Sequence, residues 1–150
     1  MASAREPPKR LFRQAAGIIE PTTGWYQPWY VEMRLEQEIE RASRYGRPLS
    51  LISLRMAQSA DPFSKGQHSQ SVALGQLAMN GLRTSDLPGL LRADEYAIVL
   101  PETDRAGAET VGRRLHERLL PFGPIMRILS FPADGRSAQE LLQGAMSVTR

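Results

Sequence analysis

The sequence contains no cysteine, no long apolar run and no strong excess of charge of either sign. The absence of cysteine excludes a disulfide framework and a thiolate metal site, and it fits a reducing compartment. No stretch approaches the ~20 apolar residues of a membrane-spanning helix, and no apolar segment of a secretory signal follows the basic N-terminus. A net charge of +3 is weaker than a dedicated nucleic-acid binder would carry. We therefore expect a cytoplasmic protein that neither inserts into a membrane nor binds DNA.

The 150 residues are enough for one domain with a sizeable core. Residues 1–16 are rich in Ala, Pro, Arg and Lys, which predicts a solvated basic tail. The alternative for this tail is a contact to a membrane surface or to nucleic acid, or the end of a connecting helix from a regulatory partner. Residues 17–150 then form the folded domain. Within it, Trp25, Trp29 and Tyr30 are expected to cover the core, since no basic residues are interleaved with them as in a base-stacking surface.

Hydrophobic periodicity gives the order of elements in the folded domain. Apolar residues spaced three and four apart predict helices at 31–45, 72–82, 105–119 and 138–146. Apolar β-rich runs predict strands at 49–54 and 125–131 and a hairpin within 83–101. The hairpin contains a Pro88–Gly89 turn, and residues 102–104 supply acidic capping groups for the helix that follows. This order predicts an α+β fold, an α/β sandwich.

Two pairs of polar residues lie in or just before the predicted hairpin. Arg83 and Asp86 stand three residues apart ahead of it, and Asp94 and Glu95 stand at its tip. The first pair fits either a ligand site or a structural ion pair that caps a turn. The second pair is expected to form a solvated acidic tip, or half of a protein contact.

The stretch from residue 83 to residue 101, RTSDLPGLLRADEYAIVLP, resembles the signature region of the GGDEF family, the diguanylate cyclases that condense two GTP molecules into cyclic di-GMP. The five signature positions are occupied by Arg92, Ala93, Asp94, Glu95 and Tyr96, so both glycines are replaced. The string RASRYGRPLSLISL resembles the helix-to-strand passage of the same family. The resemblance covers roughly residues 20–146. It implies the palm-like fold of GGDEF domains and nucleotidyl cyclases, with a central, mainly antiparallel sheet flanked by helices.

The residues that hold magnesium in this family are replaced. The resemblance places its Asp-x-Asp pair at Arg55-Met56-Ala57, so a fixed positive charge stands in place of a carboxylate. Arg92 and Ala93 carry Cβ atoms where the family has glycines that let the backbone approach a triphosphate. We therefore expect no metal site, no magnesium requirement, no cofactor and no cyclase activity. The loop residue His68 is given no role.

The product-binding pattern of the family, Arg-x-x-Asp five residues before the signature, is present at Arg83 and Asp86. An ungapped register places the family's second product-site arginine at Arg114. The resemblance implies a cyclic di-GMP site in which Asp86 accepts from guanine while the arginines meet its acceptor edge and a phosphate. Helix geometry turns Arg113 toward water, so Arg114 should matter to the ligand and Arg113 should not. The expected function is an inactive GGDEF-type domain that binds cyclic di-GMP and signals through a protein partner.

Two alternatives stay open at this point. A ligand-independent interaction module derived from a GGDEF domain would use the basic tail and the hairpin tip to contact a protein partner, or a second copy in a homodimer. The third hypothesis is an enzyme that keeps some diguanylate cyclase activity. Arg55, Ala57 and the lost glycines argue against it. Titration with cyclic di-GMP separates the first two readings, and a GTP turnover assay tests the third.

Overall fold

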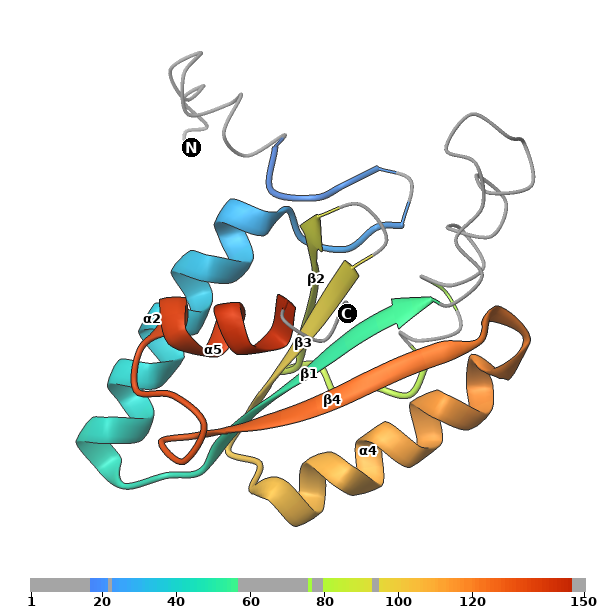
Figure 1. Ribbon diagram of the computed structural model, residues 1–150. Coiled ribbons are helices and arrows are strands. Elements are labelled where there is room, and N and C mark those ends of the chain that lie inside the picture. The colour runs from blue at the N-terminus through green and yellow to red at the C-terminus, as the bar shows by residue number, and fades with distance from the viewer. Residues whose placement is uncertain (1–16, 22, 57–75, 77–79, 93–94, 147–150) are drawn as a thin grey trace.

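The computed structural model describes residues 17–21, 23–56, 76, 80–92 and 95–146. Its centre is a four-stranded antiparallel sheet with the strand order β2-β3-β1-β4 (Figure 1). The strands are β1 (Leu49–Met56), β2 (Leu87–Arg92), β3 (Glu95–Pro101) and β4 (Pro124–Phe131). The strands predicted at 49–54 and 125–131 and the predicted hairpin are thus confirmed.

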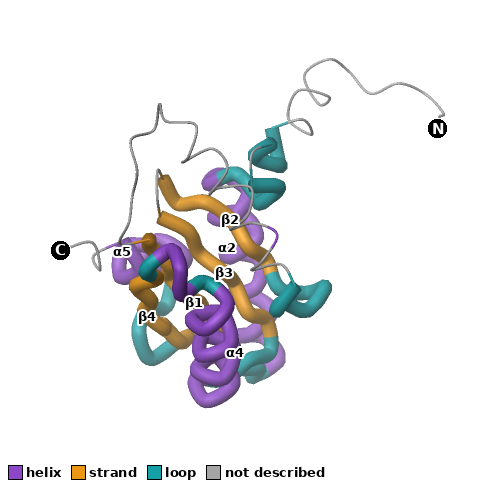
Figure 2. Tube along the Cα trace, turned by 90° about the vertical axis from the view of Figure 1, so that its right-hand side faces the viewer, coloured by secondary structure: helices purple, strands orange, loops and turns teal. Residues whose placement is uncertain are grey.

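Helices cover both faces of this sheet (Figures 1 and 2). They are α2 (Pro28–Tyr45) and α5 (Ala138–Met146) on one face and α4 (Arg105–Arg118) on the other. Neighbouring residues of a strand point to opposite faces, so β1 contributes to two cores. Leu49 and Leu51 pack in the core under α2 and α5, while Ile52 and Leu54 pack in the core under α4. The predicted α+β architecture is confirmed.

Local signals in the sequence set the helix ends. Gly46 ends α2 in the left-handed conformation, with φ 64°, as its position after the apolar stripe predicts. Asp104 caps α4, because its Oδ1 accepts a hydrogen bond of 2.8 Å from the backbone N–H of Gly107. A short 3₁₀ helix, η1 (Leu120–Phe122), connects α4 to β4.

The predicted turn at Pro88 and Gly89 is wrong, because both residues lie inside β2. A proline is tolerated there because β2 is an edge strand. The edge is covered by the segment before α2: the Tyr26 N–H donates to Pro88 O at 3.0 Å, and Tyr26 O accepts from the Leu90 N–H at 2.9 Å. A Cβ at position 89 would lie 2.0 Å from Cγ2 of Val31. Gly89 therefore serves a close approach of two segments, not a turn.

The aromatic residues near the N-terminus are only in part a cover for the core. Trp25 is buried, and its ring packs edge-on against Tyr96 with centroids 5.5 Å apart. Trp29 is 45% exposed, so its assignment to the core is wrong, while Tyr30 is half-buried. Trp29 precedes the buried Val31 on α2 by two positions, a spacing that turns a helical side chain away from the core.

Several predictions fall outside the described residues: the tail 1–16, the loop with His68, and most of the helix at 72–82. Of that helix, Gln76 is described and helical, whereas residues 80–82 form a turn, so the predicted extension of the helix to Leu82 is wrong. Within the described part of the chain, no helix combines the length and the apolar character needed to cross a membrane.

Gly112 lies in the interior of α4, where glycine is less favourable than alanine. A Cβ at this position would lie 3.7 Å from Cδ1 of Ile128 and 3.9 Å from Sδ of Met126, which are ordinary contacts. Gly112→Ala is therefore expected to raise the free energy of unfolding by about 0.5–1 kcal/mol, measured by urea denaturation.

Gly144, in α5, is the matched control for this substitution. A Cβ there would lie 2.7 Å from Cδ2 of the buried Leu129, so Gly144→Ala is expected to gain nothing or to lose stability. A loss of stability in Gly112→Ala equal to that in Gly144→Ala would contradict the packing described for α4.

Candidate functional site

Arg83 and Asp86 meet in the turn that leads into β2. The Asp86 N–H donates to Arg83 O, and Oδ2 of Asp86 accepts from the Arg83 N–H at 2.9 Å. Oδ1 of Asp86 accepts from Nη2 of Arg83 at 3.0 Å. The Asp86 side chain is 1% exposed, so both carboxylate oxygens are satisfied within the chain. The ion pair and turn cap that the sequence left as one option is therefore present.

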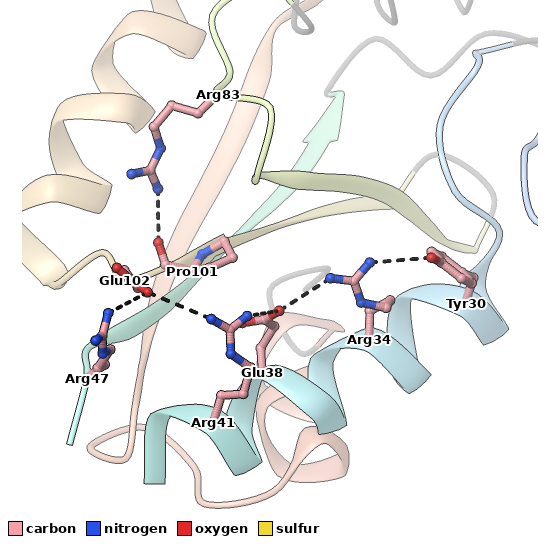
Figure 3. A network of polar contacts seen from close by, with 8 residues as sticks. All are labelled: Tyr30, Arg34, Glu38, Arg41, Arg47, Arg83, Pro101 and Glu102. Atoms are coloured by element: carbon pink, nitrogen blue, oxygen red, sulfur yellow. Dashed lines mark hydrogen bonds and ion pairs between the residues drawn. The ribbon is translucent and has the colours of Figure 1, made fainter. Parts of the chain in front are cut away.

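The same guanidinium nitrogen ties Arg83 to the end of β3. Nη2 donates to Pro101 O at 3.0 Å and to Oγ1 of Thr103 at 2.7 Å, and Figure 3 shows the side chain directed at Pro101. Three acceptors thus fix one edge of the guanidinium, while the side chain as a whole is 56% exposed. The group is held in a set orientation with part of its donor fork open to solvent.

Arg113 and Arg114 lie on different flanks of α4, and both are exposed. Arg113 lines a groove between α4 and β4, whereas Arg114 follows it by about 100° of helix rotation, on the flank that faces away from β4. Among the described residues, Arg114 makes no hydrogen bond or ion pair with Arg83 or Asp86. The structure brings Arg83 and Asp86 together. That Arg114 contributes to the same site stays a prediction.

The hairpin tip is not the fully solvated acidic turn that the sequence suggests. Glu95 is buried, and its two oxygens accept from Nε and Nη2 of Arg92. This hydrogen bond raises the pKa of Arg92, which stays charged. The expectation of a solvated Glu95 is wrong because Arg92 compensates its charge at the point where the two strands meet. Ala93 and Asp94 lie outside the described residues.

A second arginine lies opposite Glu95 in the sheet. Arg55 of β1 is its partner in the antiparallel register of β1 and β3. The buried Glu95 thus has Arg92 as its ion-pair partner and Arg55 opposite it on the next strand. In the GGDEF pattern, Arg55 stands at an expected metal-ligand position and Arg92 at an expected glycine position. The described part of the chain holds no group of three or more His, Asp or Glu side chains that could bind a metal ion. Within the described residues, Glu95 is the ion-pair partner of Arg92.

A polar network that sequence reasoning missed links α2 to the segment after β3 (Figure 3). Oε2 of Glu102 accepts from Nη1 of Arg47 at 2.8 Å and lies 3.9 Å from Nη2 of Arg41. Arg41 and Arg34 both donate to Oε2 of the buried Glu38. The i,i+3 and i,i+4 spacings around Glu38 signal the helical part of this network, but nothing local signals the partners of Glu102.

The network continues to the N-terminal end of α2. Arg34 donates to the Tyr30 hydroxyl at 3.4 Å, and this hydrogen bond, together with Glu38, raises the pKa of Arg34. At the other end of the network, Glu102 adopts φ 52°. This left-handed conformation costs a non-glycine residue on the order of 1 kcal/mol. Its neighbours Pro101 and Thr103 accept from Arg83, so this strained segment is held by ion pairs on one side and by Arg83 on the other.

Among the comparisons with known proteins, the one with solved structures shows the fold. No family model matches the sequence, and no curated protein matches it. Among solved structures, a sensory box/GGDEF family protein from Caulobacter crescentus superimposes with a TM-score of 0.77 at 22% identity, covering 87% of this chain and 94% of that one. The GGDEF domain of YfiN (TpbB) from Pseudomonas aeruginosa superimposes with a TM-score of 0.79 at 18% identity, covering 87% and 85%.

A third solved structure is the GGDEF domain of DgcB from Caulobacter crescentus in complex with c-di-GMP. It superimposes with a TM-score of 0.75 at 10% identity, and the match covers 87% of this chain and 86% of that one. The chain described above therefore has the GGDEF-domain fold, as the signature resemblance implied.

Proposed function

We propose that this chain is a catalytically inactive GGDEF-type domain of the cytoplasm that binds cyclic di-GMP through Arg83, Asp86 and Arg114 and signals through a protein partner. The observation that carries the binding half is the fixed, half-exposed guanidinium of Arg83, anchored by the buried Asp86. DgcB, which shares the fold, is known in complex with this dinucleotide.

The geometry of the Arg83 turn gives Arg83 and Asp86 different roles in this proposal. The exposed part of the Arg83 fork meets a guanine edge or a phosphate in bidentate fashion. Asp86, being buried and already bonded to Arg83, acts as a positioning residue that holds the fork. Arg114 adds a second cation from α4, which suits a ligand with two phosphates and two bases.

The positive charge of the arginines near Glu95 supports the proposal that the domain has no cyclase activity. Arg92 is paired with this carboxylate and Arg55 stands opposite Glu95 on the neighbouring strand, where a magnesium-dependent cyclase needs hard oxygen ligands. A fixed guanidinium cannot lose its proton to make room for a dication.

Isothermal titration calorimetry with cyclic di-GMP tests the binding half directly. Saturable heat in the micromolar range, and a matching rise in melting temperature, is the expected result. If cyclic di-GMP gives no heat and no thermal shift at concentrations up to about 1 mM, the dinucleotide is not a ligand and this half of the proposal is contradicted. A single guanine nucleotide, GMP, serves as the control, and it is expected to bind more weakly because it engages one base and one phosphate.

Arg114→Ala is expected to weaken cyclic di-GMP binding by about fivefold or more, and Arg113→Ala to change it by less than about twofold. Both side chains are exposed on the same helix, so the pair controls for general charge attraction. The measurement compares the two dissociation constants at matched ionic strength. Equal losses would mean non-specific attraction, and a larger loss at Arg113 would place the ligand on the β4 flank of α4.

The alternative is a ligand-independent interaction module. The observation that favours it is that the Asp86 carboxylate has its partners within the chain, as a purely structural turn would have. Under this alternative, protein binding is unchanged by cyclic di-GMP, whereas under the proposal the dinucleotide shifts the affinity for the partner.

A further inference from the structure

We propose that the left-handed conformation of Glu102, stabilised by Arg47, directs the carbonyl group of Pro101 at Arg83. Glu102 and Arg47 are then positioning residues of the cyclic di-GMP site, and neither of them contacts the ligand. This role rests on the proposed function, since it concerns the same site. Its effect on Arg83 exists before any ligand binds, however, and can be measured separately.

The backbone of Glu102 sets the direction of the Pro101 carbonyl. Its φ of 52° is the only positive value at a non-glycine residue in the described part of the chain. The peptide group between Pro101 and Glu102 is planar, so ψ of the first residue and φ of the second fix its orientation together. A turn of this peptide group that gives Glu102 the negative φ of ordinary L residues moves the Pro101 oxygen away from Nη2 of Arg83, which now donates to it at 3.0 Å.

Contacts on both sides hold the ends of this peptide group. Pro101 pairs with Leu49 in the register of β1 and β3. The backbone oxygen of Thr103 accepts from Oγ of Ser50 at 2.8 Å. Oγ1 of Thr103 donates to Pro101 O at 2.9 Å, which favours the observed direction of the carbonyl. A peptide group can turn between fixed ends by opposite changes in the two angles beside it, so its orientation is the variable part of this segment.

The carboxylate of Glu102 supports the left-handed conformation. Its Oε2 accepts from Nη1 of Arg47 at 2.8 Å and lies 3.9 Å from Nη2 of Arg41 (Figure 3). The side chains of Arg47 and Glu102 are 55% and 48% exposed, so their ion pair is modest in strength. It is of the same order as the cost of a positive φ at a glutamate. Arg47 therefore offsets the strain that accompanies the observed direction of the Pro101 carbonyl.

Glu102→Gly and Glu102→Val are the decisive pair of variants. Both remove the carboxylate, but only glycine adopts a positive φ without strain, and a β-branched residue resists it most. We expect Glu102→Gly to bind cyclic di-GMP within about twofold of wild type and Glu102→Val to bind it about tenfold more weakly, by calorimetry at one ionic strength. Equal affinities of the two variants would overturn the proposal, because the carboxylate or nothing at this position would then matter to the ligand.

Arg47→Ala should weaken cyclic di-GMP binding by about threefold when Glu102 is present, and by less than about 1.5-fold in the Glu102→Gly variant. Arg47→Lys should recover most of the affinity, since it keeps the ion pair. Arg44→Ala, near the end of α2 and paired with Glu40, controls for general attraction of an anionic ligand and should bind like wild type. An equal loss from Arg47→Ala in both backgrounds would overturn the proposal, because Arg47 would then act on the ligand directly.

A measurement on the ligand-free chain separates this role from the proposed function. The Arg83 guanidinium turns more slowly about its Cζ–Nη2 bond when acceptors hold Nη2, and nitrogen NMR measures this rotation. We expect slow rotation in wild type and Glu102→Gly, and rotation at least about threefold faster in Glu102→Val. If Glu102→Val does not fold, Arg47→Ala takes its place in the comparison. This difference in a chain that does not bind cyclic di-GMP would contradict the proposed ligand and leave the positioning role standing. Equal rotation in all folded variants would overturn the positioning role.

Discussion

Replacing Arg83 by alanine is expected to weaken cyclic di-GMP binding by about 2 kcal/mol or more, roughly 30-fold in Kd. The guanidinium is held by Asp86, Pro101 and Thr103 before any ligand arrives, so little side-chain entropy remains to be lost on binding. Arg83→Lys should recover only a part of this loss, because an ammonium group keeps the charge without the planar fork. Calorimetry of the three proteins at one ionic strength gives the comparison.

Asp86→Ala is expected to weaken the dinucleotide to a similar extent and also to lower the free energy of unfolding by about 1–3 kcal/mol. The substitution removes two hydrogen bonds from the turn before β2 and releases the Arg83 fork. Arg118→Ala, an exposed arginine at the end of α4, is the control and should behave like wild type. If both Arg83→Ala and Asp86→Ala bind like wild type, the site is elsewhere. If only Asp86→Ala weakens binding, the carboxylate contacts the ligand directly.

No cyclic di-GMP is expected to form when the pure protein is incubated with GTP and Mg²⁺ or Mn²⁺. At ~4 Å and an effective dielectric of ~20, one fixed positive charge opposes a dication by roughly 8 kcal/mol. Arg55 and Arg92 both lie around the Glu95 carboxylate, which would have to serve such a metal. Mass spectrometry of the reaction mixture, beside an active diguanylate cyclase treated identically, makes the measurement.

Arg55→Asp alone is not expected to restore turnover. Ala57 still lacks a carboxylate, and Arg92 would keep its bidentate bond to Glu95. Product formed at more than one equivalent per protein molecule by the unsubstituted chain would contradict the inactive assignment. It would leave the binding prediction for Arg83 untouched, since that rests on a different part of the fold.

The periodic elements of this protein are readable from its sequence. The spacing of apolar residues predicts α2, α4 and α5 and the strands β1 and β4 to within a few residues, and Gly46 and Asp104 mark helix ends through their own backbone and side-chain chemistry. These features depend on residues within about one helical turn, so no knowledge of distant segments is needed. The Arg83–Asp86 pair is local in the same sense, since three residues separate its members.

The tertiary structure alone decided which of these residues are buried and what they bind. Pro88 and Gly89 have the composition of a turn, yet they stay in β2 because Tyr26 supplies hydrogen bonds at that edge. Glu95 has the composition of a solvated tip, yet it is buried because Arg92 compensates its charge.

The acceptors that orient Arg83 likewise come from far along the chain. Pro101 and Thr103 are 18 and 20 residues away, and Glu102 between them pairs with Arg47, 55 residues away. Sequence spacing therefore determined the elements and the candidate pair of this protein. Burial and long-range polar partners were decided only when the strands paired and the helices packed, because these interactions join residues whose separation in the sequence carries no signal.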